Sequence, residues 1–137
     1  MSFFYSGSLP PVVLVLETAP RWAPELQRQF VSEPISIRQR TRPDEVRSLC
    51  ASSTIGLLVV NLDSREEMML HVLKEAGQSR RVPCFVVAPV ENRILEWAVR
   101  ELGIEGFSLE PLPGEVLADR IRRRLIPDRS TETSNPR

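Results

Sequence analysis

The chain has 137 residues, of which 18 are basic and 18 are acidic, so its formal net charge is zero. This length fits a single domain that buries enough apolar surface to fold without disulfides or a structural metal. Zero net charge removes the bulk attraction that dominates non-specific binding to nucleic acids and anionic membranes. Because no apolar run approaches the ~20 residues of a membrane-spanning helix, we expect a cytoplasmic protein that binds neither nucleic acid nor membrane.

The cysteine and histidine content argues against a metal centre. Cys50 and Cys84 lie in apolar stretches, no CxxC motif is present, and His71 is the only histidine. Zinc sites need several such ligands at short spacing. We therefore expect two free core thiols in a reducing compartment, with no metal and no cofactor.

From residue 11 to residue 126, apolar runs alternate with amphipathic stretches, and a proline, a glycine or a short polar cluster separates them. Such a rhythm is typical of an α/β domain in which strands and helices alternate. The expected strands are residues 12–17, 35–40, 55–62, 82–88 and 106–110. Helical spacing of the apolar residues predicts about five helices between and after these strands.

The strand patterns also predict the order of the sheet. Runs 12–17, 55–62 and 82–88 are continuously apolar, as expected for central strands that helices cover on both faces. Runs 35–40 and 106–110 alternate between apolar and polar residues, which indicates edge strands. With right-handed crossovers, these assignments predict a three-layer α/β/α domain whose parallel five-stranded sheet has the flavodoxin-like order 2-1-3-4-5.

The two ends of the chain lack this rhythm. Residues 1–10 contain an aromatic trio without periodicity, and residues 127–137 are polar. We expect a flexible N-terminal extension, one domain at residues 11–126 and a disordered polar tail. The aromatic trio could instead pack on a partner or on the domain itself.

In a sheet of this order, ligands bind at the carboxyl ends of the strands, so the residues after each strand decide the chemistry. The loop at residues 17–21 has no glycine and includes Pro20, whereas a flavin or dinucleotide phosphate needs backbone amides close to the anion. No catalytic motif and no nucleophile beside a base is found along the sequence. The sequence therefore predicts no enzymatic activity.

The length, the alternating units and the residues at the strand ends resemble the receiver domain of bacterial response regulators, over residues 11–126. Receivers carry an acidic pair after the first strand and a phosphoacceptor aspartate at the end of the third. They also carry a threonine or serine after the fourth strand and a Lys-Pro pair after the fifth. The corresponding residues here are Glu17 and Thr18, Asn61, Ala88, and Glu110 with Pro111.

The departures from the receiver pattern fall on its reactive positions. Asn61 has no carboxylate to accept a phosphoryl group, and Thr18 in place of a second acid weakens an oxygen cage for Mg²⁺. Ala88 donates no hydrogen bond, and Glu110 reverses the charge of the lysine. The only lysine, Lys74, lies in the third predicted helix. The resemblance therefore implies a degenerate phosphorylation pocket.

Asp63 is the only nearby acid that could rescue phosphorylation, because it follows Asn61 by two residues. We expect it instead in the loop before a helix capped by Ser64, where a carboxylate meets the helix N-terminus favourably. Glu17, Asp63 and Glu110 could still form an acidic pocket for a divalent ion, but we expect solvated loop acids.

The same resemblance indicates an interaction surface, since the face of helix four, strand five and helix five is the usual docking and dimerisation surface of receivers. Trp97 lies one step off the apolar stripe of the fourth predicted helix, either on this surface or packed at the edge of the core. Phe107 occupies the position of the family's aromatic switch residue. Arg120, Arg123 and Arg124 border the stripe of the last helix, as solvated charges or as contacts for an acidic partner.

Two hypotheses follow from the sequence. The first is a pseudo-receiver, a phosphorylation-independent module of bacterial signal transduction that binds a protein partner or a second copy of itself. The alternative is a flavodoxin-like domain that binds a small molecule or a metal in the crevice at the strand ends.

Overall fold

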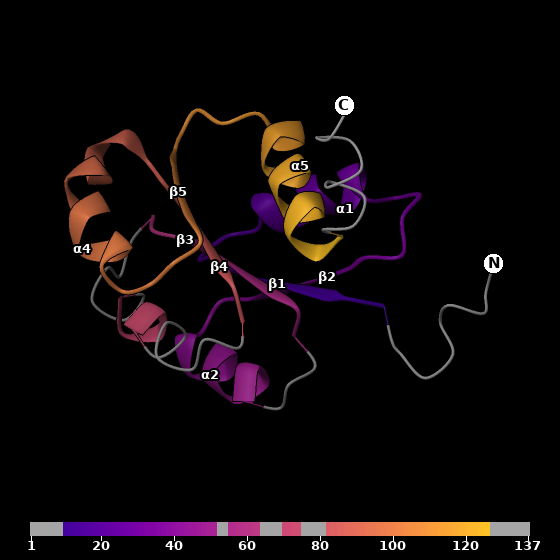
Figure 1. Cartoon of the computed structure of the whole chain (residues 1–137), viewed down its shortest axis with the longest axis horizontal. Helices are drawn as coiled ribbons and strands as arrows, with labels where there is room; N and C mark the ends of the chain where they lie inside the picture. The colour runs from indigo at the N-terminus through magenta and orange to yellow at the C-terminus, as the bar shows by residue number, and fades with distance from the viewer. Residues whose placement is uncertain (1–9, 52–54, 64–69, 75–81, 127–137) are drawn as a thin grey trace, which may run out of the picture.

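Five parallel strands form one sheet in the order β2-β1-β3-β4-β5 in the computed structural model, which describes residues 10–51, 55–63, 70–74 and 82–126 (Figure 1). The strands are β1 (Val12–Leu16), β2 (Ser36–Arg40), β3 (Leu57–Asn61), β4 (Cys84–Ala88) and β5 (Gly106–Leu109). Every neighbouring pair is parallel. The predicted strand order is confirmed.

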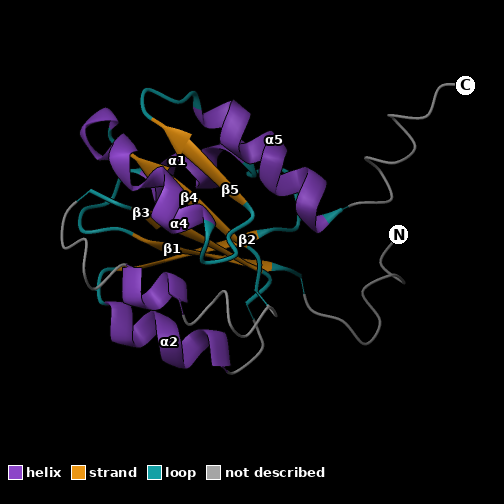
Figure 2. Ribbon diagram, turned by 60° about the vertical axis from the view of Figure 1, so that its left-hand side comes forward, coloured by secondary structure: helices purple, strands orange, loops and turns teal. Residues whose placement is uncertain are grey.

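Helices cover both faces of this sheet (Figures 1 and 2). They are α1 (Trp22–Gln29), α2 (Pro43–Ala51), the 3₁₀ helix η2 (Val90–Leu95), α4 (Glu96–Arg100) and α5 (Gly114–Leu125), and residues 70–74 are helical as well. α1 and α5 pack on one face through one cluster of buried apolar side chains. α2, residues 70–74 and α4 pack on the other face through a second cluster. The domain therefore has the predicted three-layer α/β/α architecture.

The central strands divide their side chains between these two clusters. In β1, Val13 and Val15 face α1 and α5, whereas Leu14 and Leu16 face α2 and α4. β3 and β4 are buried along their whole length, and the edge strands β2 and β5 are partly exposed. This burial explains why the central strands are continuously apolar in sequence and the edge strands alternate.

The fourth helical segment differs from the sequence-based expectation of one continuous helix over residues 91–102. Asn92 has non-helical backbone angles, and its side-chain Nδ2 donates a 2.6 Å hydrogen bond to the backbone oxygen of Leu62. Asparagine side chains compete in this way with regular helical hydrogen bonds. The segment therefore begins as a 3₁₀ helix and becomes α-helical only at Glu96. It is followed by Gly103, whose φ of 89° lies in the left-handed region that ends many helices.

The side chains of this segment that face the core differ from the predicted stripe at one position. The sequence predicts a stripe of Leu95, Ala98 and Leu102. In the structure, Val99 is fully buried, Leu95 and Leu102 pack against the core beside it, and Ala98 is exposed. Leu95, Val99 and Leu102 have the spacing of one face of an α-helix, and Trp97 lies outside this face and is exposed.

Pro10 apart, the expected N-terminal extension at residues 1–10 and the expected tail at residues 127–137 lie outside the described residues, as does the predicted cap at Ser64. Within the described part of the chain, no helix is long and apolar enough to cross a membrane.

Candidate functional site

The side chains that follow β1 and β3 meet at the carboxyl edge of the sheet. The Thr18 hydroxyl donates a 2.7 Å hydrogen bond to Oδ2 of Asp63. Asp63 lies two residues beyond Asn61, the last residue of β3, so this bond bridges the loops that leave two neighbouring strands. The structure thus brings together two of the predicted pocket residues and gives the Asp63 carboxylate a partner inside the protein.

Glu17 is a buried cap of α1, which corrects the expectation of a solvated loop acid. Its side chain is fully buried, and its carboxylate accepts hydrogen bonds from the backbone N–H groups of Trp22 (2.8 Å), Ala23 (3.0 Å) and Arg21 (3.1 Å). The first N–H groups of a helix have no partner within the helix, and a negative charge there is favourable. The acid at this strand end therefore holds α1 in place.

Glu110 is also engaged with α1 rather than solvated. Trp22 Nε1 donates a 3.0 Å hydrogen bond to Oε2 of Glu110, and Arg21 Nη1 lies 3.3 Å from Oε1. The Glu110 side chain is 18% exposed, whereas that of Arg21 is 57% exposed. A cation and an indole N–H thus offset the negative charge where the resemblance places a lysine. Pro111 follows Glu110 through a cis peptide bond.

Asn61 and Ala88 complete the edge of the sheet between these acids. Asn61 is only 4% exposed, and Ala88 is fully buried. Among the described residues, Oδ1 of Asn61 and Oδ1 of Asp63 are buried oxygens without a hydrogen-bond partner. The described residues contain no group of three or more His, Cys, Asp or Glu side chains that could hold a metal ion. Each of the three acids proposed for an ion pocket has partners within the protein: Glu17 and Glu110 both contact Arg21 and Trp22, and Asp63 contacts Thr18.

The two thiols behave as core residues. Cys84 is buried and Cys50 partly buried, and both are free. Burial raises the pKa of Cys84, with a further contribution from the neighbouring Cys50 thiol, and burial alone raises the pKa of Cys50. Both thiols therefore stay protonated at neutral pH, which disfavours a role as nucleophile or metal ligand.

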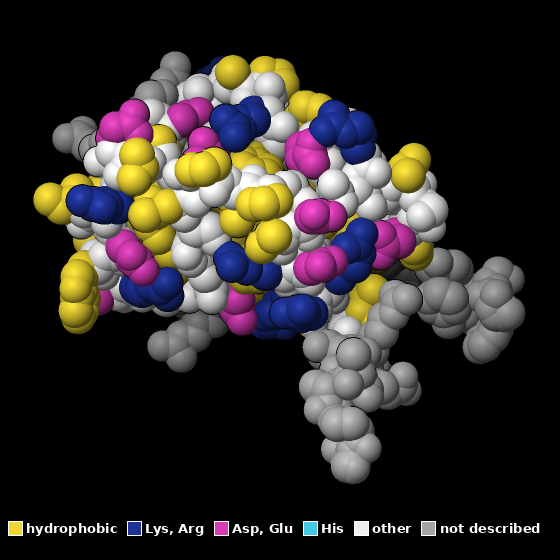
Figure 3. Space-filling model, turned by 90° about the horizontal axis from the view of Figure 1, so that it is seen from above, with side chains coloured by type: hydrophobic (Ala, Val, Ile, Leu, Met, Phe, Trp, Pro, Cys, Tyr) yellow, Lys and Arg dark blue, Asp and Glu magenta, His cyan; other side chains and the backbone are white. Residues whose placement is uncertain are grey.

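The candidate interaction surface is only partly as predicted. Trp97 is 79% exposed. Ile94, three residues before it, is 82% exposed, and the apolar pattern of the sequence did not identify it. Phe107 is 8% exposed and lies beneath the surface rather than on it. Arg120, Arg123 and Arg124 are all exposed on α5. On the face shown in Figure 3, basic and acidic side chains lie intermingled, with no broad patch of either sign.

We expect Thr18→Val to destabilise the fold by about 1–2 kcal/mol, measured by urea unfolding. The substitution removes the hydroxyl that bonds Asp63 and leaves a largely enclosed carboxylate without that partner. Thr18→Ser keeps the hydroxyl and should change stability by less than about 0.5 kcal/mol. Equal losses for both variants would show that the bond contributes nothing.

No sequence model of a known protein family matches the chain. By sequence it is similar to the DNA mismatch repair protein MutL of Anaeromyxobacter dehalogenans (strain 2CP-C), at 29% identity over 117 residues. This match covers 79% of the chain but only 19% of that protein. A MutL of Anaeromyxobacter sp. (strain K) is 35% identical over 79 residues, which are 51% of this chain and 13% of that protein. The chain thus spans at most about a fifth of these curated relatives.

Many of the solved structures that the chain resembles are receiver domains. The signal receiver domain of a putative LuxO repressor protein from Vibrio parahaemolyticus has a TM-score of 0.75 at 17% identity, covering 94% of this chain and 100% of that one. The receiver domain of the TMAO respiratory system response regulator TorR has a TM-score of 0.74 at 19% identity, covering 85% and 97%. A response regulator from Thermotoga maritima has a TM-score of 0.73 at 14% identity, covering 85% and 98%. The chain therefore has the receiver-domain fold.

Proposed function

We propose that this protein is a pseudo-receiver, a protein-interaction module of bacterial signal transduction that works without phosphorylation and catalyses no reaction. The receiver fold supports the signalling class. The observation that carries the proposal is the buried Glu17 carboxylate, which accepts three backbone hydrogen bonds at the start of α1. An acid that caps a helix in this way is not presented to a bound ion.

The remaining pocket residues support the same interpretation. Formation of an acyl phosphate requires a carboxylate nucleophile, and the carboxamide of Asn61 is not one. Mg²⁺ prefers carboxylate oxygens, but one Asp63 oxygen is held by Thr18. Glu110 places a carboxylate where a phosphoryl group would need a positive charge, and its contacts with Arg21 and Trp22 hold this carboxylate against α1. The degenerate pocket thus serves the stability of the fold.

The proposed module comprises residues 11–126 and works in the cytoplasm, where the free thiols Cys50 and Cys84 are compatible with a reducing environment. Its partner is a protein or a second copy of the chain, bound through the face formed by α4, β5 and α5. The exposed Trp97 side chain supports this choice, because large exposed aromatic residues are enriched at the centres of protein interfaces.

Incubation with acetyl phosphate and Mg²⁺, followed by intact-mass measurement, tests the proposal. We expect the mass to stay that of the unmodified chain, because Asn61 has no carboxylate and the carboxylate of Asp63 is held by Thr18. The gain of one phosphoryl group on Asp63 or any other pocket residue would contradict phosphorylation independence.

Asn61→Asp is the matched variant for this experiment. It supplies the carboxylate that receivers carry at the end of β3. It does not change the hydrogen bonds of Glu17 to the start of α1 or the ion pair of Glu110 with Arg21. We expect this variant to remain unmodified too. Efficient phosphorylation of Asn61→Asp would show that the contacts of Glu17 and Glu110 do not disable the pocket.

A further inference from the structure

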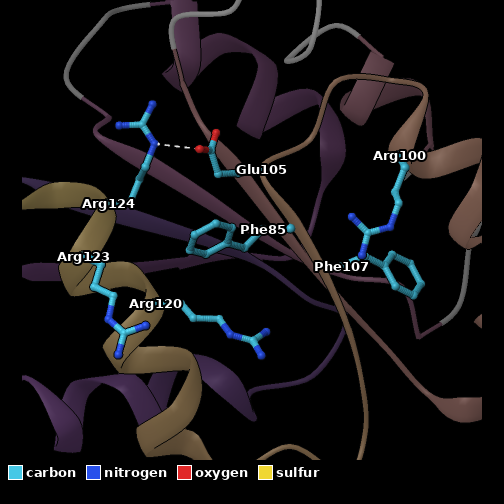
Figure 4. A pocket seen from close by; sticks show the side chains of 8 residues that line it. Phe85, Arg100, Glu105, Phe107, Arg120, Arg123 and Arg124 are labelled. Carbon is cyan, nitrogen blue, oxygen red and sulfur yellow. Dashed lines mark hydrogen bonds and ion pairs between the residues drawn. The ribbon is translucent and has the colours of Figure 1, made fainter. Parts of the chain in front are cut away.

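A groove of about 500 Å³ lies between α5 and the end of α4, where β4 and β5 begin (Figure 4). Phe85 and Phe107 form its floor, and each is 8% exposed. Asn61 ends β3 and pairs with Val87 near the opposite end of β4. The groove is therefore separate from the degenerate pocket.

Arginine side chains from two helices line this groove. Figure 4 shows Arg120 and Arg123 on α5 at one side and Arg100 at the opposite side, next to Phe107. Arg124 lines the groove as well, and its Nε lies 3.0 Å from Oε2 of Glu105, the one acid in the lining. The groove is thus strongly basic although the whole chain has zero net charge.

Two of these four arginines pair with acids, since Arg100 Nε lies 2.7 Å from Oε2 of Glu96 and Arg124 pairs with Glu105. The other two, Arg120 and Arg123, have no acidic partner among the described residues. Arg120 donates to the neutral hydroxyl of Ser108, which leaves its charge uncompensated. Arg123 makes no hydrogen bond or ion pair within the described part of the chain. A helix C-terminus favours basic residues, but this effect does not require arginines of α4 and α5 to line the same groove.

A second hollow, of about 580 Å³, shares Arg100 with the basic groove. Ile94 and Trp97 supply its apolar lining, and the charged residues Arg93, Glu96 and Glu101 line it as well. Ile94 and Trp97 are the two most exposed large apolar side chains of η2 and α4, at 82% and 79%. A ligand that fits the whole surface therefore carries negative charge at one end and an apolar group at the other.

We propose that this surface binds an acidic segment of a protein partner, with carboxylates on Arg120 and Arg123 and a large apolar side chain on Trp97 and Ile94. The inference rests on the proposed function, since it specifies the partner of that interaction module. The planar guanidinium donates two parallel hydrogen bonds to a carboxylate, and a buried aromatic anchor adds apolar contact. A small phosphate compound would use the arginines alone, and nucleic acid would need a broad basic surface.

Fluorescence anisotropy with synthetic peptides tests this proposal on the full chain. The main probe carries a run of glutamates, a Gly-Ser spacer and a Leu-Phe pair, and the comparison peptides replace either the glutamates by lysines or the Leu-Phe pair by serines. We expect the main probe to bind, the lysine peptide not to bind, and the serine peptide to bind about tenfold more weakly.

Two substitutions locate the binding. Arg123→Glu breaks no contact of the described residues and should weaken binding of the main probe about tenfold or more. The control is Arg38→Glu, which makes the same charge change on β2, the opposite edge strand, and should change the affinity less than about twofold. Trp97→Ala should weaken the main probe but not the serine peptide. Equal effects of Arg123→Glu and Arg38→Glu would overturn the proposed site.

The same assay separates other ligands from the proposed one. Complete competition by inorganic phosphate, with no contribution from the Leu-Phe pair, would overturn the proposal in favour of a small-anion site. Tighter binding of a DNA oligonucleotide than of the acidic peptide would overturn it in favour of nucleic acid. Neither result affects phosphorylation independence, because acetyl phosphate probes the other end of the sheet.

Discussion

Glu17→Ala should lower the free energy of unfolding by about 3 kcal/mol, which corresponds to a fall in Tm of about 10 °C for a domain of this size. The substitution removes the acceptor of three backbone N–H groups, two of which belong to the buried residues Trp22 and Ala23. Loss of a helix cap costs about 1–2 kcal/mol, and unpaired buried donors add to this loss. Chemical and thermal unfolding measure the effect.

Two further variants test the cause of this loss. Glu17→Gln keeps the shape but replaces one oxygen by a donor that faces other donors, so we expect a loss of about 1–2 kcal/mol. Glu101→Ala is the matched control, because Glu101 is exposed and should change stability by less than about 0.5 kcal/mol. If Glu17→Ala were as stable as Glu101→Ala, the carboxylate would not be a structural cap.

Arg122→Ala should destabilise the fold by about 2–3 kcal/mol, because Arg122 joins α5 to the end of α1 and the loop after it. Its Nε and Nη2 donate hydrogen bonds of 2.8–3.0 Å to both carboxylate oxygens of Glu33, and Nη2 also donates to the Gln29 carbonyl at 3.1 Å. The guanidinium carbon lies 5.0 Å from the centre of the Phe30 ring. A guanidinium that bonds both oxygens of a carboxylate, partly shielded from water, contributes more to the stability of the fold than an exposed ion pair does.

The controls for Arg122 lie beside it on α5. Arg123→Ala should change stability by less than about 0.5 kcal/mol, and Arg122→Lys should lose about half as much as Arg122→Ala because lysine lacks the planar fork. The hydrogen bond to Glu33 raises the pKa of Arg122 above its value in the unfolded chain. The contribution of Arg122 to the stability of the fold is therefore complete at any pH below that unfolded value, which is itself high. The loss should therefore be the same from about pH 6 to about pH 9. Similar losses for Arg122→Ala and Arg123→Ala would contradict the assigned contacts.

The fold was predictable from the sequence because the burial pattern distinguishes central from edge strands. The limits of the strands were less accurate, since the predicted runs included Ile55, Leu62 and Val82. These residues are buried but lie outside the strands. An apolar pattern reports burial rather than the hydrogen bonds of the sheet, so it extends into buried loop residues.

The positions of the candidate pocket residues at the strand ends were predictable, but their contacts were not. Glu17 caps a helix that begins five residues later, whereas sequence rules look for a cap directly before the helix. The one available signal was the absence of Ser, Thr, Asp or Asn at Arg21, the residue before α1. The contact between Trp22 and Glu110 joins residues 88 positions apart, and nothing local in the sequence indicates it.

The exposure of Trp97 was one of two alternatives that the sequence left open. Helical periodicity places Trp97 one step off the apolar stripe but does not distinguish an exposed side chain from one packed at the edge of the core. In the structure Trp97 is 79% exposed, and Val99 occupies the core position of this turn. The start of the segment as a 3₁₀ helix was not predictable, because the Asn92 side chain bonds the Leu62 carbonyl, 30 positions away in sequence.

The most direct measurement is a two-dimensional NMR titration of the protein with Mg²⁺ and then beryllofluoride, followed at the amides of Thr18, Asn61 and Asp63. If the strand-end acids hold the fold together instead of an ion, these signals stay where they are throughout the titration. Saturable shifts centred on the three residues would mean that the edge of the sheet still accepts a cation and a phosphoryl mimic, and the account given above would be wrong.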